Sequence, residues 1–432
     1  MKQYAKFILM SLMLLTGSLS AATHTWTGAS NNYWSGAGNW NTGTIPTASN
    51  TTDVIISGTT NMGMFFGTSS YTVRSLTFDD TNDANTSFTL QRTGNNGSGS
   101  SSLTFSSNSG IASLTVAAGS TGDKTLNRGG AGVASVVLTS SLDIVHNGSG
   151  NLTFGSQINT TGAGGINKSG TGTFVLAGSN TYTGNTSISD GTIQIGATGR
   201  LGAGAYAGRI SNNGTFIYSG TNNQTLSGTI TGTGNMIKNA ASTLTLSGNN
   251  SYSGTATINS GTLKVASVGA LGQAESIVVN TGGSLLVGVE NSIGDDTDIT
   301  LNGGTIKFEG SINENVGALT LSADSIIDME GGDIQLEFAI LYATLESYNL
   351  KIYNYSLYSD HLYFNGSTYV NESLPRIQFY SDAGNTLIGD SFIRDFGITN
   401  EVYPVPEPGV YFTGLLLLGL IMYYQYFKKS RC

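Results

Sequence analysis

Cysteine is nearly absent from this sequence of 432 residues, because the single one, Cys432, is its last residue. No intramolecular disulfide can therefore stabilise the fold, and zinc sites built from paired CxxC motifs are excluded. Charged residues are also scarce: they make up 10% of the chain, against a usual ~25%, which argues against a coiled coil or a mainly helical protein. Proline occurs only 5 times, and the 60 glycines follow no G-x-y period, so collagen is excluded as well.

Basic residues are the scarcer charge, with 18 Lys and Arg against 27 Asp and Glu and a net charge of -9. Binding to nucleic acid through phosphates needs clustered basic residues, and the sequence contains no basic stripe, so we expect no nucleic-acid partner. The 38% of hydrophobic residues supply enough apolar surface for a core. The sequence therefore predicts a folded, acidic protein.

Residues 1–22 predict a secretory signal peptide. A basic start precedes an apolar stretch at 7–15, and small residues including Ala21 and Ala22 follow it. The apolar stretch is short for the ~20 residues of a membrane span, so we expect cleavage at Ala21 and Ala22 rather than an uncleaved anchor.

Residues 405–432 form a tail of three parts: a Pro-Glu-Pro motif, an apolar run at 410–427 and a basic end. The apolar run covers roughly 27 Å as a helix, which is enough to cross the hydrocarbon core of a membrane. The tail resembles the PEP-CTERM sorting signal, which implies processing by an exosortase in a Gram-negative-type bacterium. An ordinary retained membrane anchor is the alternative. The predicted sorting residues are Val405, Pro406, Glu407, Pro408, Lys428, Lys429 and Arg431.

The body of the chain contains an internal repeat. Residues 176–202 read LAGSNTYTGNTSISDGTIQIGATGRLG, and residues 246–272 read LSGNNSYSGTATINSGTLKVASVGALG, at a constant offset of 70 without a gap. Self-similarity at a fixed spacing is typical of stacked architectures. Alternating apolar and polar residues within the repeat predict short strands, and Gly and Asn between them suit tight corners.

Short strands with turn residues every 8 to 12 positions fit either a sandwich or a solenoid. The repeat and the Gly/Asn/Thr-rich corners favour an all-β, right-handed parallel β-helix with a capping segment at each end. The best candidate for a helix within the body is 338–347. The expected domains are a signal peptide at 1–22, a Trp-containing segment or cap at 23–99, the β-helix at 100–310, a Tyr-rich segment or cap at 311–404 and the sorting signal at 405–432.

The repeat resembles the autotransporter-associated, or passenger-associated transport, β-strand repeat of large secreted β-helical proteins. The resemblance is clearest at 174–202 and 244–272. It implies an exported β-helix, whereas the sorting tail implies a route other than the self-export of autotransporters.

Nothing in the sequence predicts a catalytic, cofactor or metal site. The three histidines, His24, His146 and His361, lack metal-ligand spacing, and no nucleophile elbow or phosphate loop stands before a helix. Two acidic stretches, at 295–298 and 324–333, are interpreted as solvated turns, with Ca²⁺ binding and paired-carboxylate catalysis as weaker alternatives. The clustered tryptophans and tyrosines near the two ends fit capping of a solenoid or stacking on sugar rings.

The sequence therefore predicts an exported, non-enzymatic β-helical protein of the cell surface or extracellular polysaccharide matrix. The expected partners are an exosortase, exopolysaccharide, and the inner membrane through 410–427 before processing. An adhesin that binds cells or glycans is the first alternative, and a β-helical polysaccharide lyase or glycosidase is the second.

Overall fold

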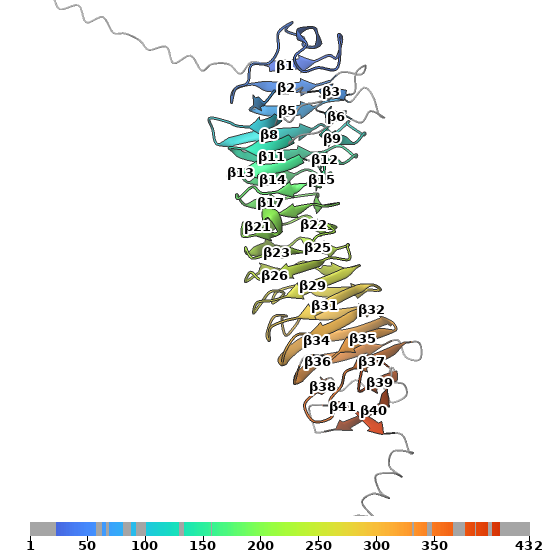
Figure 1. Ribbon diagram of the computed structural model, residues 1–432. Helices are drawn as coiled ribbons and strands as arrows, with labels where there is room; N and C mark the ends of the chain where they lie inside the picture. The colour runs from blue at the N-terminus through green and yellow to red at the C-terminus, as the bar shows by residue number, and fades with distance from the viewer. Residues whose placement is uncertain are drawn as a thin grey trace, which may run out of the picture.

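The computed structural model describes residues 23–57, 63–65, 69–80, 88–91, 101–128, 134–156, 158–330, 332–343, 348–365, 376–384, 386–395 and 400–406. These residues form a parallel β-solenoid of the right-handed type with almost no helix, which confirms the predicted fold class. The chain winds from the N-terminal to the C-terminal end of one elongated column (Figure 1). The helical elements among the described residues are two single 3₁₀ turns, η1 (Ala37–Asn39) and η2 (Gly202–Gly204).

Each coil contributes strands to stacks that run along the column. The first stack is one parallel sheet of ten strands: β1 (Thr23–Trp26), β2 (Asp53–Ile56), β5 (Ser75–Phe78), β8 (Ile111–Val116), β11 (Ser141–His146), β14 (Ile166–Ser169), β17 (Thr186–Ile188), β21 (Ile210–Asn212), β24 (Ile230–Gly232) and β27 (Ser251–Tyr252).

The second stack lies on another side of the column and continues further toward the C-terminal end. Its strands pair in the order β3 (Gly63–Phe65), β6 (Phe88–Gln91), β9 (Lys124–Leu126), β12 (Leu152–Phe154), β15 (Thr173–Leu176), β18 (Thr192–Ile195), β22 (Thr215–Tyr218), β25 (Asn235–Lys238), β28 (Ala256–Ile258), β30 (Ser276–Asn280), β32 (Asp298–Asn302), β34 (Ile312–Ala323), β36 (Ile334–Ala343) and β38 (His361–Phe364).

The third stack comes in three pieces. The first holds β4 (Tyr71–Val73), β7 (Ser101–Phe105), β10 (Ala134–Leu138) and β13 (Ile158–Gly162), and the second holds β16 (Ser179–Asn180) and β19 (Arg200–Leu201). The last piece runs through β20 (Ala205–Tyr206), β23 (Gln224–Leu226), β26 (Thr243–Leu246), β29 (Gly261–Val265), β31 (Gly283–Val287), β33 (Thr305–Phe308), β35 (Ser325–Asp328), β37 (Asn349–Tyr353) and β39 (Arg376–Tyr380).

The core is a set of inward side chains stacked in register from coil to coil. In the second stack, Phe216 pairs with Met236 and Met236 with Ala256, and all three are buried. Alternate residues of each strand point outward, because successive side chains of a strand face opposite sides. Each fully buried Leu, Ile or Phe contributes about 1.5–3 kcal/mol, so the regular apolar alternation in the sequence accounts for most of the fold's stability.

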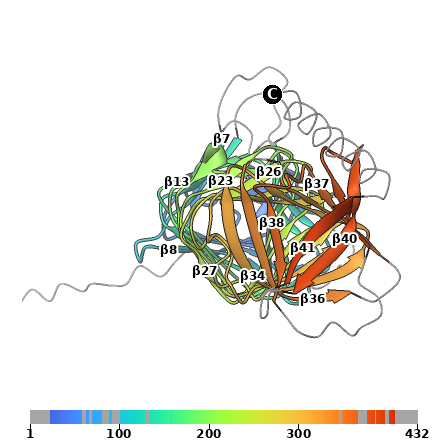
Figure 2. The same cartoon turned by 90° about the horizontal axis from the view of Figure 1, so that it is seen from below.

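The parallel coils extend beyond the expected 100–310 in both directions. Strand β1 pairs in parallel with β2, and near the other end β37 pairs in parallel with β39. The pairing turns antiparallel only at the last strands, β40 (Leu387–Asp395) and β41 (Asn400–Pro406), which pair with each other and cover β39 and β38 respectively. Figure 2 shows these two strands lying across the C-terminal end of the column. The helix candidate at 338–347 is wrong over its described part, since 338–343 belongs to β36, whose apolar residues continue the solenoid core.

The 70-residue offset does not correspond to a whole number of coils. The three coils that follow β17 take 24, 20 and 20 residues, so an offset of 70 ends one strand further round the column. Strand β17 thus lies in the first stack, whereas the strand equivalent to it in sequence, β28, lies in the second. The same local structure is therefore built on two different sides of the solenoid.

The glycines shared by both copies are required where neighbouring coils approach closely. A Cβ atom on Gly178 would overlap the carbonyl oxygen of Ile158, and one on Gly248 would overlap that of Gly228. Gly191 and Gly261 have φ angles of 67° and 71°, in the left-handed region that favours glycine.

Candidate functional site

The predicted sorting residues fall mostly outside the described part of the chain. Val405 and Pro406 are described, and they end strand β41, where they pair with Asp390 and Gly389 of β40. Among the described residues, no helix is long and apolar enough to cross a membrane. The residues that lie outside the description are Ala21, Ala22, Glu407, Pro408, the run 410–427, Lys428, Lys429 and Arg431.

The three tryptophans are buried, so they do not present rings to a sugar. Trp26, Trp34 and Trp40 are each at most 3% exposed. Trp40 lies edge-on to the other two rings, with centroids 5.0 Å from Trp26 and 4.8 Å from Trp34, and its indole N–H donates to the Trp34 carbonyl at 2.8 Å. Such edge-to-face contacts add to the area that aromatic rings bury, so these residues close the N-terminal coil.

The histidines lie far apart and have different surroundings. His24 contacts the Thr42 hydroxyl at 3.1 Å, and His361 contacts the Glu401 carboxylate at 2.6 Å, which links β38 to β41. His146 is fully buried in β11. No three His, Cys, Asp or Glu side chains of the described residues converge as a metal site.

Buried lysines were missed by the sequence analysis. Lys168 and Lys238 occupy equivalent positions of the two copies, and neither is exposed. The Lys168 ammonium donates to the Ser169 carbonyl at 2.8 Å and to the Asp190 carbonyl of the next coil at 3.3 Å. Lys238 donates to Ala240 of its own coil and to Ser260 of the next, and burial lowers the pKa of both lysines to about 8. Each lysine therefore ties two coils together at a corner.

One surface feature gathers ionisable side chains around a concave space, which we call the C-terminal hollow. It encloses about 350 Å³ on the outer side of the third stack. Its lining comes from three successive coils that carry β31, β33 and β35, and consists of Leu286, Lys307, Phe308, Glu309, Gly310, Asp328 and Glu330.

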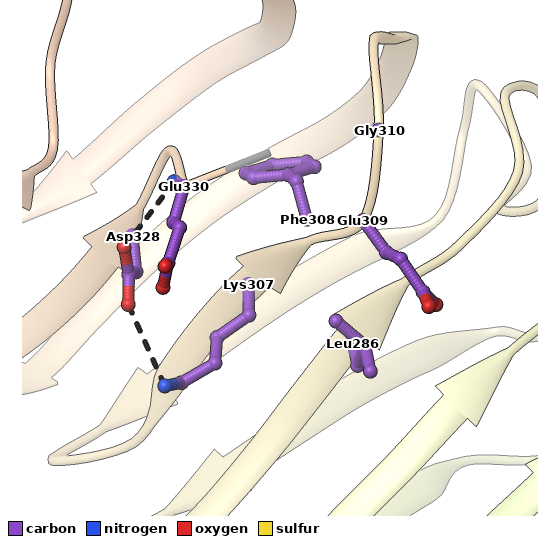
Figure 3. A pocket seen from close by; sticks show the side chains of 7 residues that line it. All are labelled: Leu286, Lys307, Phe308, Glu309, Gly310, Asp328 and Glu330. Carbon is purple, nitrogen blue, oxygen red and sulfur yellow. Dashed lines mark hydrogen bonds and ion pairs between the residues drawn. The ribbon is translucent and has the colours of Figure 1, made fainter. Parts of the chain in front are cut away.

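Strand register brings the lining residues of the C-terminal hollow together. Leu286 pairs with Lys307, and Lys307 pairs with Asp328, so one residue from each coil forms a continuous row. Figure 3 shows the Lys307 ammonium reaching toward Asp328, with Glu330 beside Asp328. Asp328 and Glu330 belong to the acidic stretch noted in the sequence, whereas Lys307 and Glu309 come from the preceding coil and lie more than 15 positions earlier in the chain.

Two ion pairs neutralise part of the charge of the C-terminal hollow. The Lys307 ammonium lies 3.5 Å from a carboxylate oxygen of Asp328, and Lys264 pairs with Glu309. Asp328 also accepts hydrogen bonds from the Asn354 side-chain amide at 2.6 Å and from the backbone N–H of Glu330 at 3.3 Å. An oxygen that accepts this many donors stabilises the ionised carboxylate, so Asp328 is a fixed acceptor rather than a proton donor. The geometry suits binding of a polar ligand.

Similarity to known proteins points to exported passenger domains. Two segments match the Passenger-associated-transport-repeat family. They are residues 166–195 and 236–265, the two copies related by the offset of 70. These repeats contain both buried lysines and end in β18 and β29, so the family pattern coincides with the strands and corners described above.

One curated relative is the "Adhesin BmaC autotransporter" of Brucella suis biovar 1 (strain 1330). It is 30% identical over 214 residues, which cover 42% of this chain and 6% of the relative. The chain thus aligns with a small fraction of that relative's length. No solved structure matches the chain.

Proposed function

We propose that the chain is an exported, non-enzymatic surface protein whose solenoid serves adhesion within a polysaccharide matrix. The proposal is supported chiefly by the passenger-associated-transport repeats, which lie in the middle of the described solenoid. The named adhesin among its relatives favours an adhesive role over a purely structural one. A solenoid suits this role, because its stacked coils expose a long lateral surface on a rigid frame.

The proposal includes processing at the C-terminal end. The tail at 405–432 carries the Pro-Glu-Pro motif, the apolar run and the basic end of a sorting signal, which an exosortase would cut after transient anchoring in the inner membrane. The end of β41 places Val405 and Pro406 beside β40, so the motif begins where the folded body ends.

Intact-mass analysis of the full chain from surface and culture fractions of its native host tests this proposal. The expected mature protein lacks both 1–22 and the region after about 408. A mass that retains 410–432 would replace sorting by permanent anchoring. A deletion of the whole gene should weaken attachment of the cells to one another or to matrix, and unchanged attachment would count against the adhesive role.

An enzymatic role predicts a different result. The purified chain should leave matrix polysaccharide at its original length after prolonged incubation. Shortening of the polymer that disappears in Glu330→Gln or in Asp328→Asn would show that the chain is a lyase or glycosidase.

A further inference from the structure

The C-terminal hollow carries an inference about the ligand, which rests on the proposed adhesive function. We propose that the hollow binds a cationic amino sugar of a partly de-N-acetylated glycan, with the ammonium group next to the Glu330 carboxylate and the ring against Leu286 and Phe308.

The charge balance of the hollow requires a positive group. Lys307 pairs with Asp328, and Lys264, at the edge, pairs with Glu309. Glu330 is exposed at the rim and has no ion-pair partner among the described residues. One negative charge is therefore left uncompensated, and a ligand that covers it without a cation would partly desolvate a free carboxylate.

The shape and apolar part of the hollow favour a compact ring over a flexible chain. A volume of about 350 Å³ lies at the lower end of the ~300–1,000 Å³ that small-molecule sites occupy. Leu286 and Phe308 supply apolar atoms to the lining, which suit the C–H face of a pyranose. Lys307 and Asp328 provide a donor and an acceptor at the same wall for ring hydroxyl groups.

The hollow is also held in place before any ligand arrives. Its wall consists of paired strands, and Asp328, whose side chain is 9% exposed, is fixed by Asn354 from the next coil. The Glu330 N–H donates to Asp328, so this bond sets the course of the backbone that carries the free carboxylate. Pre-organised groups lose little conformational entropy on binding, which favours affinity.

The same argument excludes other ligand classes. A uronate would place its carboxylate near Glu330 in a protein with a net charge of -9, and like charges repel. An N-acetylated or neutral sugar fits the apolar wall but leaves Glu330 without a partner. A lysine side chain matches the charge, but it has no ring to occupy the space beside Leu286 and Phe308.

Calorimetric titration of the purified full chain tests the proposal. The probes are the glucosamine tetrasaccharide, its fully N-acetylated counterpart, a galacturonate tetrasaccharide and tetralysine. The glucosamine compound should bind most tightly, and Glu330→Gln should weaken its binding about tenfold, the value expected for losing one charge-assisted hydrogen bond. Glu290→Gln, at an exposed glutamate outside the hollow, is the matched control and should leave binding unchanged.

Each remaining outcome overturns the proposal. Equal binding of the acetylated sugar would remove the role of charge, and equal binding of tetralysine would remove the role of the ring. An equal loss in Glu290→Gln would mean diffuse attraction to an acidic surface. Absence of binding in a chain that is exported, processed and adhesive would refute this inference alone, whereas a retained tail or unchanged attachment would refute only the proposed function.

Discussion

Two buried tyrosines at equivalent positions of the two copies should respond in opposite ways to the same substitution. Tyr182 and Tyr252 are each 1% exposed. The Tyr182 hydroxyl lies 2.7 Å from the Thr186 hydroxyl, which in turn lies 2.9 Å from the hydroxyl of Tyr206. In the second copy the position of Thr186 is taken by Ala256, and the Tyr252 hydroxyl has no hydrogen-bond partner among the described residues.

The expected magnitudes follow from these contacts. Tyr182→Phe removes one hydrogen bond and should lower the free energy of unfolding by about 1 kcal/mol. Tyr252→Phe removes a buried hydroxyl without a partner, so it should be neutral or raise that free energy by about 1–2 kcal/mol. Ala256→Thr should supply the missing partner and stabilise the coil by about 1 kcal/mol, since Thr186 fills the equivalent place in the first copy.

Urea unfolding of the full chain, combined with hydrogen exchange of the amides around each tyrosine, measures these effects. Exchange is needed because a solenoid opens locally, and each coil mainly contacts its neighbours. Equal destabilisation by Tyr182→Phe and Tyr252→Phe would refute the reasoning, because it would mean that the two hydroxyls are equally well bonded. A loss of stability in Ala256→Thr combined with the expected tyrosine results would show only that the second copy lacks space for the methyl group.

Three further predictions concern pH, the corner asparagines and a glycine. Burial, and then the charge of nearby Lys168, lowers the pKa of His146 to about 4, whereas burial raises that of Glu314 to about 7. The folded state then binds fewer protons at His146, so its coils should lose up to about 3 kcal/mol as the pH falls from 6.5 to 4, while those around Glu314 should weaken as the pH rises from 4.5 to 7; uniform exchange rates over both ranges would contradict this. Asn259 donates to Asn239 at 2.8 Å and accepts from Asn280 at 2.6 Å, so Asn259→Ala should cost about 1–2 kcal/mol in urea unfolding, more than Asn239→Ala, and equal losses would show that the ladder adds nothing. Gly248→Ala should cost more than about 2 kcal/mol, because its Cβ would overlap the Gly228 carbonyl, and a neutral result by thermal unfolding would show that the coils can separate there.

The local rules visible in the sequence predicted the fold well. Alternation in segments such as 192–195 and 262–265 gave the strands, and the glycines at 191 and 261 marked corners with positive φ. The boundaries were less accessible. Parallel pairing continues through β34 and β36, where the repeat motif is absent, because stacking needs only inward apolar residues at the coil spacing and not the motif itself.

The candidate site was only half visible in the sequence. The acidic stretch at 324–333 was noticed, but it was interpreted as a solvated turn. Its partners Lys307 and Glu309 are contributed by another coil, and the length of that coil depends on its corners. The buried lysines escaped notice for a related reason: a lysine in a polar segment predicts exposure, and only the carbonyl groups of two stacked coils make its burial favourable.

The sequence by itself determined that this chain stacks short strands around an apolar interior, because period-two alternation and corner glycines are local properties of the chain. It also determined the copies at an offset of 70, whose capacity to form the same corners depends on neighbouring residues. Only the tertiary structure decided on which side of the column each copy lies, since coils of 20 to 24 residues do not divide that offset evenly. It decided the C-terminal hollow in the same way, because the pairing of β33 with β35 sets which charges meet.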